Sequence, residues 1–185
     1  MPKRTLWVVS LSLVATWAIA FDDYLSAKRK FDQIEAEQFR AGSRVVLTPG
    51  ELNAWVAHEV PAGIRNPKVW VSSPGIATAT ALIDFAKVRS GQGHEPGWMM
   101  KHLLEGEHPV TVTARIRSEN GTATVDVQKV QIAAVEVDGK TLDFLIQNFL
   151  LPLYPDAAVG RPFELGHRIE KLDVQPGAVG VWIGK

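Results

Sequence analysis

The side chains best suited to catalysis or metal binding gather in one polar stretch near the middle of the chain. Three histidines and three glutamates lie there: His94, Glu95, His102, Glu105, Glu107 and His108. Imidazole and carboxylate groups bind zinc and act as general acids and bases, so this cluster is the candidate for a metal or hydrolase site. Its spacing matches no helical histidine pair, however, and glycines interrupt it at positions 91, 93, 97 and 106. We therefore favour a polar loop that happens to carry histidines.

The rest of the chain carries no recognisable catalytic motif. No GxSxG, HExxH, Walker or GxGxxG pattern is present, and these are patterns that place a nucleophile, a metal or a phosphate. The sequence has no cysteine, which excludes disulfides, thiolate metal ligands and a cysteine nucleophile. His58 and His167 have no obvious partner in the sequence and are interpreted as surface or capping residues. We expect a protein that is not an enzyme and has no catalytic residue, metal ligand or cofactor.

The charge balance indicates which partners to exclude. The chain has 20 Lys and Arg residues against 20 Asp and Glu residues, for a formal net charge of zero. Residues 1–20 include Lys3 and Arg4 but no acid, so the remaining chain carries a formal charge of minus two. A nucleic-acid partner would require a clustered basic surface to face its phosphates. We therefore expect no nucleic-acid binding, and 46% hydrophobic with 22% charged residues fits a globular domain with a core.

Residues 1–21 have the pattern of an export signal. Lys3 and Arg4 precede an uncharged apolar run that ends in Ala18-Ile19-Ala20. The small residues at positions 18 and 20 suit cleavage of a signal peptide, whereas the length of the run is close to the lower limit for a membrane-spanning helix. Cleavage and retention both stay open. In either case the positive flank places the residues after Phe21 across the membrane, in the periplasm or outside the cell.

Residues 22–42 mix charged and apolar residues at three-and-four spacing, which predicts an amphipathic helix. Because no proline or glycine separates it from the apolar run, the favoured prediction is an uncleaved inner-membrane anchor followed by a helical stalk. The alternative is an N-terminal helix packed on the domain. Residues 43–185 then form a single α+β domain.

The most apolar stretch of that domain is residues 141–154, TLDFLIQNFLLPLY. It predicts a helix, with one apolar stripe at three-and-four spacing formed by Leu142, Leu145, Ile146, Phe149, Leu150 and Leu153. Phe144 and Leu151 lie off this stripe, so the helix must be covered on nearly all sides. A core helix is the ordinary explanation. The alternative is that part of the face lines a cavity for an apolar ligand, because ligand pockets are mostly apolar.

Strand-like runs with alternating apolar residues surround this helix. They cover residues 67–72, 76–88, 109–117, 123–134, 163–174 and 178–183. Asn120-Gly121 predicts a two-residue hairpin turn. The apolar phase of the returning strand changes near Gln128-Lys129, which predicts a bulge that bends the sheet. We expect an α+β fold in which a strongly curved antiparallel sheet wraps around the apolar helix, preceded by the N-terminal membrane or signal helix.

The start of the domain carries its best-defined local motif. Residues 44–47, RVVL, predict a short strand. Thr48-Pro49-Gly50-Glu51 is a capping box, with the threonine at the N-cap and the proline at the first helical position. The helix that it starts is expected to end near Pro61.

With this motif and the ending FLLPLYP…IEKLDVQPGAVGVWI, the chain resembles the small membrane-anchored lipid-binding proteins of the TULIP-like group. The YpmS-like and LmeA-like families look most similar. The resemblance extends roughly from Arg44 to Ile183 and rests on hydrophobic pattern, Leu47-Thr48 and Glu51-Leu52-Asn53. It implies a twisted sheet that wraps a helix to form a lipid-holding groove, here as a half-module, and it brings no catalytic residues.

Two functions from different classes fit these patterns. The first is an envelope protein that binds or shuttles a lipid or other apolar ligand in a groove between sheet and helix. Its expected lining combines the helical stripe with four sheet residues and three rim residues: Leu142, Leu145, Ile146, Phe149, Leu150, Leu153, Ala79, Ala81, Ile83, Phe85, Trp98, Met99 and Leu103. The second is a membrane-anchored structural or interaction module with a dry core, which engages another envelope protein.

Overall fold

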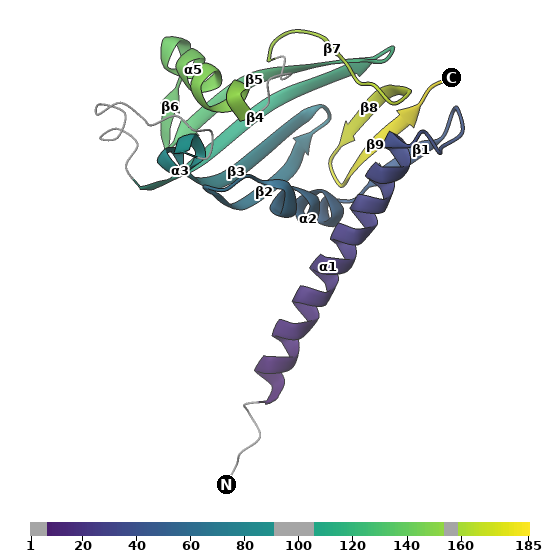
Figure 1. The fold of residues 1–185 in the computed structure, drawn as a ribbon, viewed down its shortest axis with the longest axis horizontal. Helices are drawn as coiled ribbons and strands as arrows, with labels where there is room; N and C mark the ends of the chain where they lie inside the picture. The colour runs from purple at the N-terminus through teal and green to yellow at the C-terminus, as the bar shows by residue number, and fades with distance from the viewer. Residues whose placement is uncertain (1–6, 91–105, 154–158) are drawn as a thin grey trace.

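The structure is a computed structural model that describes residues 7–90, 106–153 and 159–185 (Figure 1). In chain order its elements are α1 (Trp7–Glu35), β1 (Arg44–Leu47), α2 (Pro49–Glu59), β2 (Ile64–Ser73), β3 (Ile76–Asp84), α3 (Phe85–Ser90), β4 (Glu107–Glu119), β5 (Thr122–Ile132), β6 (Val135–Val137), α5 (Gly139–Leu145), the π-helical turn η1 (Ile146–Leu150), α6 (Leu151–Leu153), β7 (Phe163–Glu164), β8 (Ile169–Gln175) and β9 (Ala178–Ile183). The mixed α+β class is therefore confirmed.

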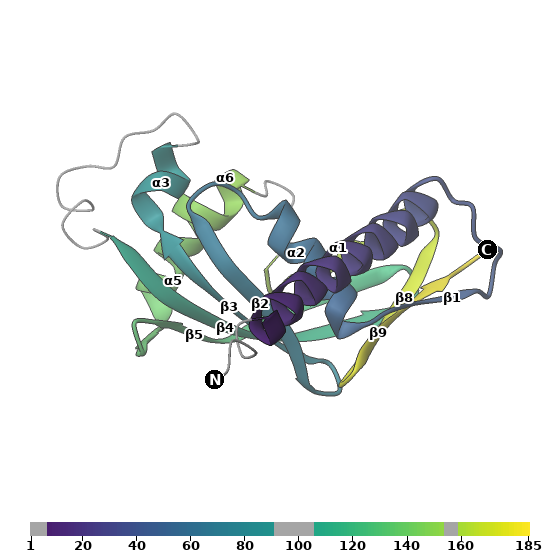
Figure 2. The same ribbon diagram turned by 90° about the horizontal axis from the view of Figure 1, so that it is seen from below.

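The strands form two sheets and not the single sheet that the sequence led us to expect. The large sheet has the order β2-β3-β4-β5-β6, with β7 also paired to β5, and the small sheet has the order β1-β9-β8. Both are antiparallel. Backbone bonds join them, because Gly75 N donates to Val174 O at 2.9 Å and Gly121 N donates to Glu170 O at 2.7 Å. Figures 1 and 2 place the small sheet at one end of the molecule and α3 and α5 at the other.

The predicted hairpin and the predicted bulge are both confirmed in β4 and β5. Asn120 and Gly121 have φ of 51° and 75° and form a two-residue turn between the paired residues Glu119 and Thr122. Positive φ at both central positions is the type I′ pattern, which asparagine followed by glycine favours. Further along, Thr113 pairs with Lys129 but Ala114 pairs with Val127, so Gln128 is the extra residue of a bulge.

The β5–β6 hairpin makes a similar turn with less suitable residues. Ala133 and Ala134 have φ of 49° and 68°, between the paired residues Ile132 and Val135. A left-handed backbone costs a residue with a Cβ about 1 to 2 kcal/mol. We expect Ala133→Asn with Ala134→Gly to raise the free energy of unfolding by about 1 kcal/mol, measured by urea titration. The converse change at Asn120-Gly121, to two alanines, should lower it, and no change in either hairpin would contradict this account.

The second half of α1 packs on the domain. Ala27 and Ile34 are buried, and Ile34 belongs to a hydrophobic core with residues of the small sheet: Val45, Leu47, Val181 and Ile183. The Phe31 ring also lies 4.5 Å from the Trp55 ring of α2. The helix after Phe21 is thus docked on the domain. The sequence favoured a helical stalk over residues 22–42 and left a packed N-terminal helix as the alternative. Among the described residues, no helix is long and apolar enough to cross a membrane.

The capping box at the start of α2 also fixes this helix to α1. Thr48 Oγ1 accepts from the Glu51 amide at 3.2 Å, and Glu51 Oε2 accepts from the Thr48 amide at 2.8 Å, which confirms the predicted motif. The same carboxylate accepts from Lys30 Nζ and Ser26 Oγ, both at 2.6 Å. Glu51 is buried, so its charge is compensated entirely by groups that come from α1 and from its own cap.

Asn53, two residues after the capping box, attaches α2 to the large sheet. Its Nδ2 donates to the carbonyl of Val69 at 2.8 Å, and its Oδ1 accepts from the amide of Val69 at 2.8 Å. Val69 lies on β2, the edge strand of the large sheet. A side-chain amide that pairs both backbone groups of an edge residue takes the place of a further strand at that point.

Candidate functional site, an apolar cavity

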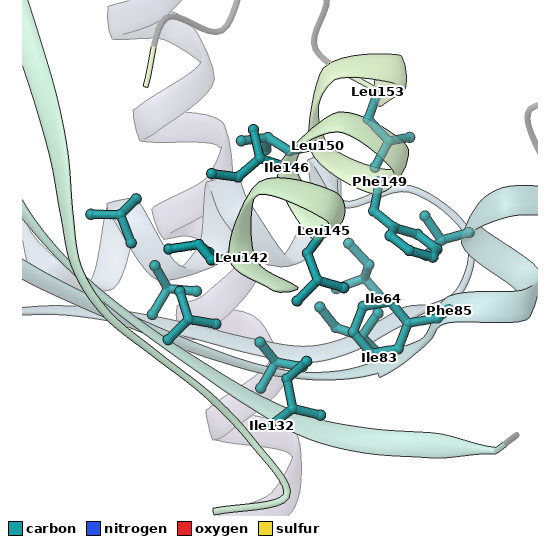
Figure 3. A pocket seen from close by; sticks show the side chains of 15 residues that line it. Ile64, Ile83, Phe85, Ile132, Leu142, Leu145, Ile146, Phe149, Leu150 and Leu153 are labelled. Carbon is teal, nitrogen blue, oxygen red and sulfur yellow. The ribbon is translucent and has the colours of Figure 1, made fainter. Parts of the chain in front are cut away.

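A cavity of about 240 Å³ lies between the large sheet and the helical segments α3, α5, η1 and α6 (Figure 3). Its 15 lining side chains are all hydrocarbon: Ile64, Ile83, Phe85, Val88, Val110, Val112, Val127, Val130, Ile132, Leu142, Leu145, Ile146, Phe149, Leu150 and Leu153. Part of this lining is the second hydrophobic core of the protein. Such a surface offers dispersion contacts and no hydrogen bond.

The sheet wall of the cavity is set by strand alternation and by the bulge. Val110 pairs with Ile132 and Val112 pairs with Val130, so these four side chains share one face of the sheet. Val127 is three positions before Val130, and an unbroken strand would point it to the opposite face. The extra residue Gln128 corrects the phase. The bulge therefore adds one more apolar side chain to the cavity wall.

The helical wall begins at Gly139 and contains a π turn at Ile146–Leu150, whereas the sequence led us to expect a helix over residues 141–154 that only its prolines interrupt. The Leu151 amide donates to the carbonyl of Ile146, five residues earlier. Pro152 has no N–H to continue the regular bonding pattern, and Asn148 Nδ2 donates to the carbonyl of Phe144 at 2.8 Å. In Figure 3 the side chains of Leu145 and Phe149 point from this segment toward the strands.

Asp84 positions the third part of the wall, helix α3. The Lys87 amide donates to Asp84 Oδ1 at 3.0 Å at the start of the helix, and Lys87 Nζ lies 3.0 Å from Oδ2. The backbone hydrogen bond from Lys87 holds the pKa of the Asp84 carboxyl below its usual range despite burial. This cap starts α3 where the strand β3 ends, so that Phe85 and Val88 face the cavity.

Eight of the side chains that the sequence nominated as ligand-lining border this cavity together. They are Leu142, Leu145, Ile146, Phe149, Leu150, Leu153, Ile83 and Phe85. Ala79 and Ala81 are not part of the lining, although their pairing with Val112 and Val110 puts them on the same face of the sheet. The nominated rim residues Trp98, Met99 and Leu103 lie outside the described residues.

Seven lining residues were not nominated from the sequence: Ile64, Val88, Val110, Val112, Val127, Val130 and Ile132. Five of them could have been identified from the sequence, because they are the inward-facing residues of the alternating strands β4 and β5. Ile64 is the first residue of β2, and Val88 belongs to the short helix α3, where the sequence led us to expect the strand to continue. Their part in the site depends on how distant elements pack.

The chain shows no likeness from which a function could be transferred. Comparison with protein-family models, with curated proteins and with solved structures finds no match. The function is therefore inferred from the chemistry of the cavity. None of its 15 lining side chains can transfer a proton or coordinate a cation, so the cavity is suited to binding.

The histidine and glutamate cluster considered for metal chemistry falls mostly outside the described residues, at positions 94, 95, 102 and 105. Of its other members, Glu107 forms an ion pair with Arg65, and the ring of His108 lies 6.4 Å from that of Phe85. Within the described part of the chain, no group of three or more histidines and carboxylates is arranged to hold a metal ion.

Proposed function

We propose that this protein binds the hydrocarbon part of a lipid or similar amphiphile and acts as a non-catalytic carrier. The observation that carries the proposal is the cavity of about 240 Å³ with 15 hydrocarbon side chains around it. Apolar cavities smaller than this stay dry and bind small hydrocarbons. Each methylene removed from water contributes about 0.8 kcal/mol, so a short length of chain gives useful affinity without a polar anchor.

The finer fold that we propose is a large sheet curved around the segment α5-η1-α6, as the resemblance to TULIP-like proteins implies. Two observations support it. The bulge at Gln128 bends β5 beside the cavity, and Leu145 and Leu153 pack on the core that includes Val110 of β4. The protein would then be a half-module with one groove.

We also propose an envelope location, with the domain in the periplasm or outside the cell. The basic flank and apolar run of residues 1–21 support export. A carrier in that compartment exchanges its ligand with the membrane or with another envelope protein. Retention of the N-terminal segment would keep the domain at the membrane surface.

Native mass spectrometry of the full chain, isolated from a bacterial envelope fraction and freed of detergent, tests the proposed function. We expect a reproducible added mass that organic extraction removes. The full chain is required because Ile34 of α1 is part of the core, so a fragment starting at Arg44 would lack it. A bare polypeptide mass with a cooperative melting transition would contradict lipid binding and favour an interaction module.

A further inference from the structure

The lining of the cavity has a fully buried cluster at one end and partly exposed leucines and an isoleucine at the other. The buried end is the cluster of Phe85, Val88, Val110 and Phe149, whose exposed fractions are 5%, 4%, 8% and 7%. Leu142, Ile146 and Leu150 retain partial exposure. Figure 3 shows Leu142 and Phe85 on opposite sides of the lining, with Leu145 between them. A ligand would therefore enter beside Leu142 and end against the phenylalanines.

The wall at the buried end is a pair of aromatic rings from two different elements. Phe85 comes from α3 and Phe149 from η1, and their ring centroids lie 5.1 Å apart at an interplanar angle of 75°. This edge-to-face arrangement is the preferred geometry of an aromatic pair. The Asp84 cap fixes α3 on one side. The ring of Phe149 also lies 6.4 Å from that of Phe144 on the other side. The end wall is thus anchored through the cap of α3.

We propose that the Phe85–Phe149 pair sets the length of hydrocarbon chain that the cavity accepts. The inference rests on the proposed lipid-binding function and names its ligand class: a single unbranched chain, inserted methyl end first. The polar head must stay outside at the partly exposed end, because the lining has no polar side chain to compensate its desolvation. Scaled from a cavity of about 150 Å³ that holds benzene, the inserted part is roughly ten carbons.

Calorimetric titration of the full chain with saturated fatty acids of increasing length tests this proposal. For the wild type, affinity should rise about four-fold per added methylene and become constant once roughly ten carbons are inserted. In a Phe149→Ala variant the rise should continue for roughly six more carbons, since a benzene-sized space opens at the end wall. In Leu151→Ala, the matched truncation of a neighbouring leucine that does not line the cavity, the limiting length should not change.

An unchanged limiting length in Phe149→Ala would overturn the proposed role of the pair while leaving lipid binding intact. Absence of binding to wild type at every chain length would overturn the proposed function together with this inference. If Phe149→Ala does not melt cooperatively, Phe85→Leu tests the same wall with a smaller change in volume. It should lengthen the accepted chain by a smaller step, and an unchanged length would again overturn the proposal.

Discussion

A Leu145→Asp variant is expected to bind an apolar ligand at least about 100-fold more weakly than the wild-type chain. Leu145 lies in the middle of the helical wall and contacts the core behind the cavity. A ligand that fills the cavity would have to desolvate the new carboxylate, which has no partner among the lining side chains. That desolvation costs several kcal/mol, and every 1.4 kcal/mol is about ten-fold in affinity. Titration with a fluorescent fatty acid measures the loss.

Phe144→Asp is the matched control for this experiment. Phe144 is the preceding residue of α5, is 37% exposed and does not line the cavity. Its carboxylate would stay in water, so affinity should remain within about three-fold of wild type. Thermal melting establishes that both variants are folded. Similar losses in the two variants would show that the ligand does not occupy the cavity.

The helical wall could be predicted from sequence because its signal is local. Three-and-four spacing alone indicates that Leu142, Leu145 and Phe149 share a face, whatever they pack against. Pro152 was expected to break the helix, but the π turn that precedes it was not predicted. The π turn changes the backbone bonding but not the set of lining side chains, since all six residues of the predicted apolar stripe still border the cavity.

The opposite wall was predictable only in part. Alternation gave the faces of β4 and β5, and the phase change at Gln128 gave the bulge, so Val127 and Val130 were placed correctly relative to their neighbours. Strand alternation does not predict whether Ala79 and Ala81 line the cavity. They share the cavity's face of the sheet, but the cavity lies over β4, β5 and the end of β3. Lateral position on a sheet is set by helix packing, which strand periodicity does not encode.

The docking of α1 was left open for the same reason. Lys30 is one of the charged residues of the predicted amphipathic helix, yet it pairs with the buried Glu51, 21 positions further along the chain. Ala27 belongs to the three-and-four pattern of the predicted amphipathic helix, and it is fully buried. The identity of each residue is plain from the sequence, but its contact joins positions far apart in the chain, and local patterns do not predict such contacts.

Glu51 is the residue whose ionisation should make the stability of the fold most sensitive to acid. Its burial favours the neutral acid, but hydrogen bonds from Lys30, Ser26 and the Thr48 amide outweigh that effect and lower its pKa from 4.5 to about 2. The folded state therefore releases the proton more readily than the unfolded state. The resulting stabilisation is present above pH 4.5 and is lost as the pH falls toward 2. It amounts to about 3 kcal/mol in total.

Urea unfolding of the wild type and of a Glu51→Gln variant at pH 7 and pH 3 measures this contribution. Between these values the wild type should lose about 2 kcal/mol more than the variant, because glutamine does not titrate. Asp173→Asn is the control: Asp173 also has a lowered pKa, caused by Gln175 and Arg44 at a more exposed site. It should keep most of the wild-type acid sensitivity. Equal pH dependence in wild type and Glu51→Gln would contradict the role assigned to this carboxylate.

The two largest effects should also be independent of each other, because they act on different cores. Glu51 joins α1 to α2 beside the core of the small sheet, whereas Leu145 contacts the core that includes Phe85 and Phe149. Distant sites with no shared partners contribute additively. At pH 7, Glu51→Gln should therefore lower stability without weakening fatty-acid binding, and Leu145→Asp should weaken binding without changing the acid sensitivity. A loss of binding in Glu51→Gln would mean instead that the docking of α1 holds the cavity in shape.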